Sequence, residues 1–414
     1  MTLRAFWLGC AVLALAGLLV KPAAAQNEPV RIGLLTVKTG PLAEGGIQME
    51  QGLTLCLKEH HGMMAGRKVE LVVGDTGGNP AGAKTKVQEL VERDKVDMIQ
   101  GPLAAFEAYA IADYVREANL PWLPLAAAED LTQRKAVPDM ARVLGTSSQD
   151  SKPMADYAVK TLHVKRAITI ADDFAYGHET VGGFQQVFEA EGGEVVNKLW
   201  PPLNTADYTP YLAQIAEAKN VDAVFVGLAS SNPVRFIKQF AEFGLKKKLT
   251  LLGNGTAADA PILRFLGEDA AGMYGAAAYA STYESPDNKR FLADFRTAYK
   301  VDPGLYSVAT YLGCEIIDSA LEATKGSTAD KAALIKAVRD AQLADSPRGP
   351  LRLDDYGNAI GDTFIRKIAL ENGKPVDTIV KIYPNVSQFW TFDPKKFLAQ
   401  PVYSRDFPPL THGG

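Results

Sequence analysis

Short apolar strands alternate with helices along this chain, and this alternation limits its possible folds more than any other feature. The strand-like segments are rich in Val, Ile and Leu, and most precede a segment with helical spacing of apolar residues. In chain order they are VRIGLLTV (30–37), KVELVVG (68–74), VDMIQ (96–100), LPWLPL (120–125), RAITIA (166–171), EVVNKLW (194–200), VDAVFVG (221–227) and LTLLG (249–253). Runs of such units form parallel sheets covered by helices on both faces, so the pattern predicts an α/β fold.

The later part of the chain has a different pattern. From about Ser285 to Asp345 the sequence is predominantly helical. The pieces PLRLDD and DTFIRKIALENGKPV then predict antiparallel strands around a turn at 356–358. The tail 383–414 contains several prolines and little periodicity, so we expect it to wrap the surface or fray.

Residues 1–25 have the pattern of a secretory signal peptide. Arg4 precedes an apolar run, and small residues end at Ala25, where we expect cleavage. The alternative is an uncleaved N-terminal anchor. We therefore expect an exported, periplasmic protein. The balance of 44 basic and 48 acidic residues, a net charge of −4, gives no basic field for nucleic acid or anionic lipid.

After cleavage two cysteines remain, Cys56 and Cys314, each in a predicted helix. Export permits disulfides, but two cysteines so far apart in sequence do not form a recognisable framework. We therefore expect both to be small buried apolar residues rather than a bridge or a nucleophile.

The stretch from Met98 to Lys135 predicts a place where an anion could bind. One strand ends at Gly101 and the next at the alanines 126–128, and each is followed by a predicted helix. In parallel sheets, ligands bind beyond the carboxyl ends of the strands, where helix N-termini supply free N–H groups and positive potential. Such a place suits a carboxylate. The alternative is two ordinary strand-to-helix turns.

Several local motifs, in order, resemble the branched-chain-amino-acid-type substrate-binding proteins of ABC transporters, which have the type I periplasmic binding fold. They are IGLLTVKTGPLAEGG, VVGDTGGNPAGAKTKVQELVERDKVDMIQGPL, LPWLPLAAAEDLT, ADDFAYG and RGPLRLDDYGN. The resemblance extends from Val30 to about Val380. It implies a receptor that delivers a ligand to a membrane permease and its ATPase.

The resemblance also implies two Rossmann-like lobes joined by a three-strand hinge, which close on a ligand. The first lobe would comprise 29–145 plus 276–348, and the second 147–273 plus 353–382. Hinges would fall near Gly145-Thr146, Tyr274-Gly275 and Gly349-Pro350. Gly and Pro suit positions where the backbone must change conformation.

By the same resemblance, the first lobe would bind the carboxylate of the ligand. The matching residues are Ala105 and Phe106 in one turn and Ala126 and Ala128 in the other. Relatives commonly carry hydroxyl side chains here, so alanines make the wall more apolar while backbone amides remain. In the second lobe the matching aromatic residue is Tyr176, and Tyr279 is a further candidate.

The loop after LTLLG lacks the acid that would pair with an α-ammonium group. Gly255 and Thr256 occupy this loop, and the first carboxylate is Asp259. A buried ammonium without a counter-charge is strongly disfavoured, so we expect a benzoate-like or phenylpropanoid acid. The alternative is an amino acid or amide, with a carboxylate supplied by one of four residues elsewhere: Glu107, Asp172, Asp173 or Asp259.

Enzyme functions receive no support from the sequence. The segment Gly253–Ala258 imitates a dinucleotide-binding turn but lacks the acidic residue that should follow a second strand. The pair His60 and His61 lies at a helix end without metal-ligand spacing, and no nucleophile motif occurs. We therefore expect no catalytic residues, no metal and no cofactor, and a monomer. Two other functions remain open: a ligand-sensing module of a regulator, and a hydrolase.

Overall fold

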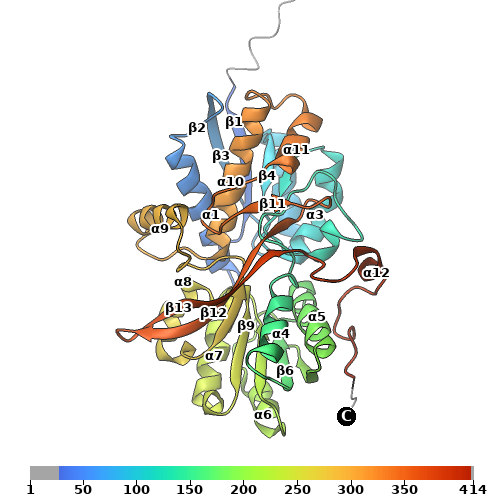
Figure 1. Cartoon of the computed structure of the whole chain (residues 1–414). Coiled ribbons are helices and arrows are strands. Elements are labelled where there is room, and N and C mark those ends of the chain that lie inside the picture. Colours follow the sequence, from blue (N-terminus) through green and yellow to red (C-terminus); the bar gives the residue numbers. More distant parts are fainter. Residues whose placement is uncertain (1–27, 412–414) are drawn as a thin grey trace, which may run out of the picture.

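The computed structural model describes residues 28–411, so the expected signal peptide lies outside the described residues. These residues form two lobes, each built around one sheet, and Figure 1 shows one lobe above the other. None of the helices between 28 and 411 is both long and apolar enough to cross a membrane. The predicted α/β fold class is confirmed.

The first lobe is built on a five-stranded sheet with the order β2-β3-β1-β4-β5. All neighbouring strands are parallel except β2, which forms an antiparallel pair with β3. The strands are β1 (Val30–Thr36), β2 (Met63–Met64), β3 (Arg67–Asp75), β4 (Met98–Gln100) and β5 (Trp122–Leu123). The helices associated with it are α1 (Ala43–Glu59), α2 (Pro80–Gln88), α3 (Ala105–Glu117), α9 (Pro286–Tyr299), α10 (Leu305–Ala323) and α11 (Lys331–Asp340).

The second lobe is built on an eight-stranded sheet with the order β11-β12-β10-β9-β8-β6-β7, and β13 pairs with β12. Its parallel strands are β6 (Arg166–Ala171), β7 (Glu194–Leu199), β8 (Ala223–Gly227), β9 (Thr250–Asn254) and β10 (Tyr274–Ala277). Its antiparallel strands are β11 (Leu351–Leu353), β12 (Ala359–Glu371) and β13 (Lys374–Val386). The helices are α4 (Ser151–Lys160), α5 (Ala175–Ala190), α6 (Thr209–Glu217), α7 (Asn232–Glu242) and α8 (Ala260–Leu266).

Strand β13 differs from the sequence prediction, which placed 362–376 in one strand. The chain reverses at Asn372-Gly373, where both residues have positive φ, +51° and +76°. Asn-Gly is the pair that a tight hairpin turn of this kind favours. The resulting hairpin of β12 and β13 crosses the waist of the molecule (Figure 1).

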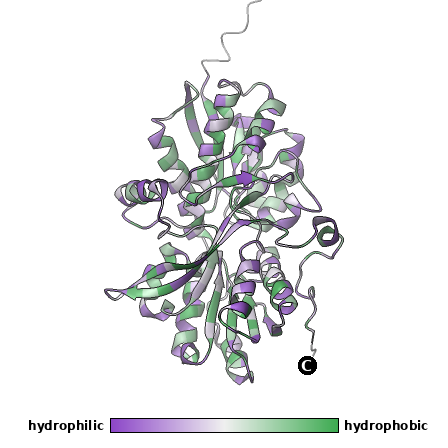
Figure 2. Ribbon diagram, viewed as in Figure 1, coloured by the Kyte–Doolittle hydropathy of each residue, from purple (hydrophilic) through white to green (hydrophobic). Residues whose placement is uncertain are grey.

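Burial follows the expected pattern. The parallel strands are almost entirely apolar and buried, as in β8, where every residue is buried. Figure 2 shows hydrophobic strands inside and hydrophilic residues on the outer helices. Separate apolar clusters form the interiors of the two lobes, one including Ile32 and Leu312 and another including Ile168 and Phe236. Each lobe therefore has its own core.

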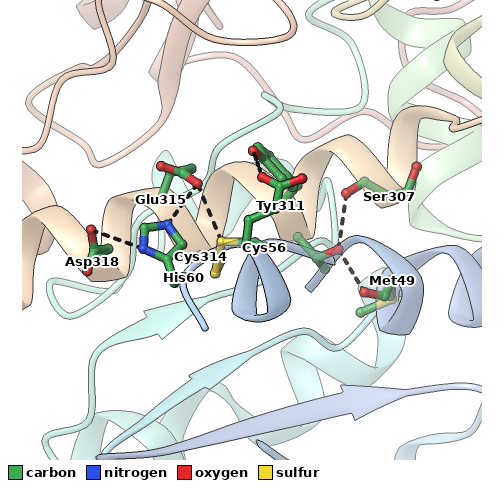
Figure 3. Close-up of a disulfide and its surroundings, with 10 residues drawn as sticks. Met49, Cys56, His60, Ser307, Tyr311, Cys314, Glu315 and Asp318 are labelled. Atoms are coloured by element: carbon green, nitrogen blue, oxygen red, sulfur yellow. Dashed lines mark hydrogen bonds and ion pairs between the residues drawn. A yellow bond between two sulfur atoms is a disulfide. The ribbon is translucent and has the colours of Figure 1, made fainter. Parts of the chain in front are cut away.

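The two cysteines form a disulfide, so the expectation that they do not bridge is wrong. Cys56 in α1 and Cys314 in α10 have Cα atoms 6.3 Å apart, although 258 positions separate them in sequence. The bridge forms because α1 and α10 pack side by side in the first lobe (Figure 3). His60 Nε2 also lies 3.2 Å from Glu315 of α10, which adds a polar contact at the same junction. Export to an oxidising compartment is compatible with such a bridge.

Candidate functional site

A cavity lies between the two lobes, at the carboxyl ends of parallel strands from both sheets. Its walls come from segments that follow β4, β5, β6, β8 and β9, from the crossover 144–150, and from the start of α10. Ligands of parallel α/β sheets bind at this edge. The space open to the centre of a water molecule is about 70 Å³. A single water needs roughly 10–15 Å³ by the same measure, so the cavity has room for a small molecule.

The first-lobe wall contains the N-terminus of α3. Ala104 and Ala105 line the cavity there. The first N–H groups of a helix have no partner within the helix, and this end carries partial positive charge. Glu107 binds only one nearby amide, accepting from Ala104 N at 3.1 Å. Ala105 is the first-turn residue of α3 that lines the cavity, and its N–H can donate to a carboxylate.

Some of the residues expected at the site line the cavity, and others lie outside its lining. Ala105, Tyr176, Gly255 and Thr256 line the cavity. Ala126 and Ala128 are fully buried and do not line it, whereas Ala127 between them does. Neighbours in an extended segment point to opposite sides, so this turn reaches the cavity through Ala127 rather than through Ala126 or Ala128. Phe106 is also outside the lining and packs its ring against Phe174, 5.5 Å between centroids.

Aromatic side chains form part of the cavity wall. Phe174 and Tyr176 stack with ring centroids 6.0 Å apart. Tyr306, at the start of α10, lines the same cavity. Burial raises the pKa of Tyr176 to about 12, so its hydroxyl stays protonated at neutral pH. Tyr279, the further candidate, lies in the core instead, and its hydroxyl bonds Asn288 Oδ1 at 3.0 Å. Sequence reasoning missed Phe174 and Tyr306.

Leucines close the cavity on several sides, and none of them was predicted. Four come from loops or helix ends and one from the crossover: Leu42, Leu103, Leu125, Leu305 and Leu144. An apolar residue in a loop has no sequence signal that separates a cavity wall from a core position. Together with the aromatic rings, these leucines make the cavity mainly apolar.

The second-lobe wall is polar where β9 ends. Asn254, Gly255 and Thr256 line the cavity there. Thr256 Oγ1 donates to Leu228 O at 2.9 Å, which fixes that side chain. Gly255 has a φ of +40°, and a Cβ at this position would lie 3.9 Å from the Tyr176 hydroxyl. This corner can exchange hydrogen bonds with a ligand.

None of the four acids considered from the sequence lines the cavity. Glu107 accepts hydrogen bonds within the first lobe, from Ala104 N and from Thr76 Oγ1 at 2.5 Å. Asp259 accepts from Leu305 N at 3.1 Å. The other two acids also have hydrogen-bond partners. Asp172 accepts from Ala229 N and from the Asn232 side chain, and Asp173 is bonded to His178 and Arg405.

One carboxylate that sequence reasoning missed does line the cavity. Asp150, just before α4, accepts from Thr363 Oγ1 at 2.7 Å and from Ala278 N at 3.1 Å. Burial raises the pKa of its carboxyl group, while the nearby Arg348 and Arg366 act in the opposite direction. Both of its oxygens thus already accept a hydrogen bond, and burial outweighs the two guanidinium groups in its effect on the pKa. A polar run follows the predicted hinge at Gly145, but nothing in the sequence shows that this run reaches the cavity.

Within the described residues, one cluster has the residue types of a metal site, Cys56, His60 and Glu315. The Cys56 sulfur is part of the disulfide, so no thiolate is available there (Figure 3). A thiolate is the form of cysteine that binds metals. The cluster is better described as the polar edge of the α1–α10 junction.

Comparisons with known proteins agree with this geometry. The sequence model of the family described as periplasmic binding protein matches residues 29–374. The Leu/Ile/Val-binding protein homolog 6 of Brucella suis is 30% identical over 365 residues, covering 87% of this chain and 92% of that protein.

Solved structures give the same assignment. An ABC transporter substrate-binding protein from Sphaerobacter thermophilus is 33% identical with a TM-score of 0.82, covering 87% of this chain and 99% of that one. A solute-binding protein of an ABC transporter from Rhodopseudomonas palustris BisB5 was solved in complex with 3,4-dihydroxybenzoic acid. It is 30% identical with a TM-score of 0.83, covering 87% of this chain and 98% of that one.

Proposed function

We propose a ligand for this chain from one premise: the chain belongs to the periplasmic binding protein family, as a substrate-binding protein of ABC transporters. Proteins of this family bind solutes in the periplasm and are not enzymes. The ligand proposed for this member is an aromatic carboxylic acid of the benzoate or phenylpropanoid type. The partners that follow are a permease and its ATPase, and the proposed state of the receptor is a monomer.

The observation that carries this proposal is the distribution of charge and apolar surface around the cavity. A carboxylate is suited to the first-lobe end, where the N-terminal amides of α3 lie beside Ala104 and Ala105. The ring is suited to the apolar middle, against Phe174, Tyr176 and Tyr306. The solved relative with 3,4-dihydroxybenzoic acid supports the same ligand class.

An amino acid is the second candidate, and Asp150 is the observation that favours it. This carboxylate lines the cavity and could face an α-ammonium group. The name of the Brucella suis relative, a Leu/Ile/Val-binding protein homolog, points the same way. We favour the aromatic acid because Asp150 already accepts from Thr363 and Ala278, and because burial raises its pKa and so disfavours the charged form that an ammonium would need.

The mechanism proposed is closure of two bodies on the ligand. The bodies are 29–145 plus 276–348 and 147–273 plus 353–382, with hinges near Gly145-Thr146, Tyr274-Gly275 and Gly349-Pro350. A ligand that contacts both lobes shifts the equilibrium toward the closed form by its differential contacts. The closed form would be the one that the permease recognises.

A thermal-shift screen of the mature protein tests the ligand class. Benzoate-type and cinnamate-type acids should raise the melting temperature, and leucine, valine and small amides should not. A ligand at 100 times its dissociation constant adds about 2.7 kcal/mol to stability, which is easily visible. Stabilisation by leucine without any by the aromatic acids would contradict the proposal.

A further inference from the structure

Two long helices of the first lobe begin beside the cavity without a side-chain cap of their own. Helix α1 is preceded by Leu42 and α10 by Gly304, and neither residue has a side chain that can accept a hydrogen bond. The first N–H groups of a helix have no partner within the helix, so they require acceptors from elsewhere. Leu42 and Leu305, the first residue of α10, line the cavity. Both helix ends therefore lie at the ligand site.

The second lobe supplies an acceptor to each of these helix ends. Ser230, beyond the end of β8, accepts through Oγ from Gly45 N in the first turn of α1 at 3.3 Å. Asp259, beyond the end of β9, accepts through Oδ2 from Leu305 N at 3.1 Å. Both accepting side chains are buried. Two helices of the first lobe are thus capped from the other lobe.

The lobes approach each other most closely where α10 begins. Both carboxylate oxygens of Asp259 lie within 3.2 Å of Leu305 N. A Cβ on Gly304 would lie 2.6 Å from Pro261 Cγ and closer still to Asp259 Oδ2, both in the second lobe. The φ of Gly304 is −122°, which any residue can adopt, so its backbone does not require glycine. The close packing of the second lobe does.

The contact at Asp259 requires an acceptor rather than a charge. Burial raises the pKa of Asp259 to about 7, and Arg366 acts in the opposite direction. This arginine already forms a buried ion pair with Asp377, with 3.4 Å between nitrogen and oxygen. At pH 6 the Asp259 side chain is therefore mainly uncharged. Its carbonyl oxygen can still accept from Leu305 N.

Two further contacts join the lobes near α1. Ser231 Oγ donates to Pro41 O at 3.2 Å, and Arg264 lies 3.5 Å from Glu44. The ion pair is partly exposed, and exposed pairs contribute little to stability. The buried caps on α1 and α10 are therefore the contacts of this region that we expect to matter most.

We propose that Asp259 and Ser230 are positioning residues for lobe closure, which hold the lobes together by capping α10 and α1 from the second lobe. This inference rests on the closure mechanism of the proposed function but not on the class of ligand. Neither residue lines the cavity, so neither selects the ligand. Separation of the lobes would remove both acceptors, and closure restores them. The caps therefore favour the closed form equally for any ligand in the cavity.

Calorimetric titration of the mature, full-length protein at pH 6 tests this inference. The probes are benzoate, 4-hydroxybenzoate and leucine. The Asp259→Ala/Ser230→Ala double variant should bind every probe that the unaltered protein binds about tenfold more weakly, because two caps of the closed form are lost. The factor should agree between probes to within about twofold, since the caps do not touch the ligand. Unchanged affinity, or a loss confined to one of several bound probes, would overturn the inference.

Two first-lobe helices that are capped within their own lobe provide the matched control. Asp330 accepts from Ala333 N at the start of α11, and Ser285 accepts from Asn288 N at the start of α9. The Asp330→Ala/Ser285→Ala double variant removes the same two types of cap without altering a contact between the lobes. It should lower stability in urea but leave affinity within about twofold of the unaltered protein. An equal loss of affinity in this control would overturn the role in closure.

Two single variants keep the inference testable if the first double variant does not fold. Asp259→Asn keeps an acceptor oxygen and should bind within about threefold of the unaltered protein at pH 6. Gly304→Ala places a Cβ against Pro261, Asp259 and the flexible end of Gln48, and should weaken every bound probe by about threefold or more. A tenfold loss in Asp259→Asn, or unchanged affinity of folded Gly304→Ala, would overturn the inference.

The outcomes separate this inference from the proposed function. Binding of leucine alone would contradict the proposed ligand class, whereas an about tenfold loss of leucine affinity in the Asp259→Ala/Ser230→Ala variant would still support the caps. Binding of no probe would contradict the proposed ligand class, and small-angle scattering of the ligand-free proteins would then decide the inference. A larger radius of gyration of this double variant would support it, and equal radii would overturn it.

Discussion

At the scale of single residues, the clearest result concerns the acids around the cavity. From the sequence we expected the second-lobe loop at Gly255 to lack an acid, and we kept four acids elsewhere as candidates to pair with an α-ammonium group. Those four do not themselves line the cavity, whereas Asp150, which no motif identifies, lines it. Sequence gives residue type and spacing, but the direction of a side chain depends on packing by segments distant in sequence.

Tyr176 should contribute strongly to ligand binding, because its ring forms part of the apolar wall. We expect Tyr176→Ala to weaken affinity for an aromatic acid at least tenfold through loss of that contact area. The fold should persist, as judged by circular dichroism. Tyr211→Ala, an aromatic residue of α6 outside the cavity lining, is the control. Unchanged affinity in calorimetry would remove Tyr176 from the site.

Asp259 should make stability depend on pH. It lies buried and accepts from Leu305 N, and burial raises its pKa from 3.8 to about 7. Between about pH 4 and 7 the folded state therefore binds more protons than the unfolded state. The contribution of Asp259 to stability is full below about pH 4 and is lost as the pH rises through about 7. The slope for one such group is at most about 1.4 kcal/mol per pH unit.

The test is the free energy of unfolding measured by urea titration from pH 4 to 8. Asp259→Asn should show a smaller decrease than the unaltered protein over this range, because the amide does not titrate. Replacement of the exposed Asp345 by Asn is the control and should follow the unaltered protein. Parallel pH profiles for Asp259→Asn and the unaltered protein would refute the role assigned to Asp259.

At the scale of elements, most strands and long helices could be predicted, and their partners could not. The parallel strands β1 and β6 to β9 lie within one or two residues of the predicted ranges, because buried apolar runs have a strong local signal. The β12–β13 hairpin was missed although Asn372-Gly373 marks its turn. The Cys56–Cys314 bridge was missed because it depends on how α1 packs against α10.

The disulfide should stabilise the first lobe without direct contact to the ligand. It joins α1 and α10 away from the cavity lining. We expect the Cys56→Ala/Cys314→Ala double variant to lose about 2–4 kcal/mol of unfolding free energy, by removing a cross-link from the unfolded chain. Ligand affinity, measured by calorimetry, should change less than about threefold. Equal stability of the double variant and the unaltered protein would contradict this account.

At the scale of the whole molecule, the C-terminal segment 387–411 connects the two lobes. It includes the short helix α12 (Pro394–Leu398), which the sequence did not indicate. Arg134 of the first lobe donates to Phe397 O and Gln400 O, both at about 3 Å. Further along, Tyr403 and Arg405 bond to the second lobe, at Gln186 and Asp173. The segment therefore contacts both lobes at once.

Removal of the second-lobe contacts of this segment should favour opening. A chain that ends at Gln400 keeps α12 and the contacts of Arg134 but loses Tyr403 and Arg405. We expect its affinity to decrease by about three- to tenfold, because a restraint that joins the segment to the second lobe is lost. Small-angle scattering of the ligand-free protein should show a larger radius of gyration. Unchanged values of both would show that the segment does not restrain the lobes.

The central claim is that the cavity binds an aromatic acid rather than an amino acid. Calorimetric titration of the mature protein with 4-hydroxybenzoate, followed by leucine in the same cell, tests it most directly. We predict one-to-one binding of 4-hydroxybenzoate and no heat from leucine beyond dilution. One-to-one binding of leucine that 4-hydroxybenzoate neither matches nor displaces would contradict the claim and make Asp150 the counter-charge of an amino-acid site.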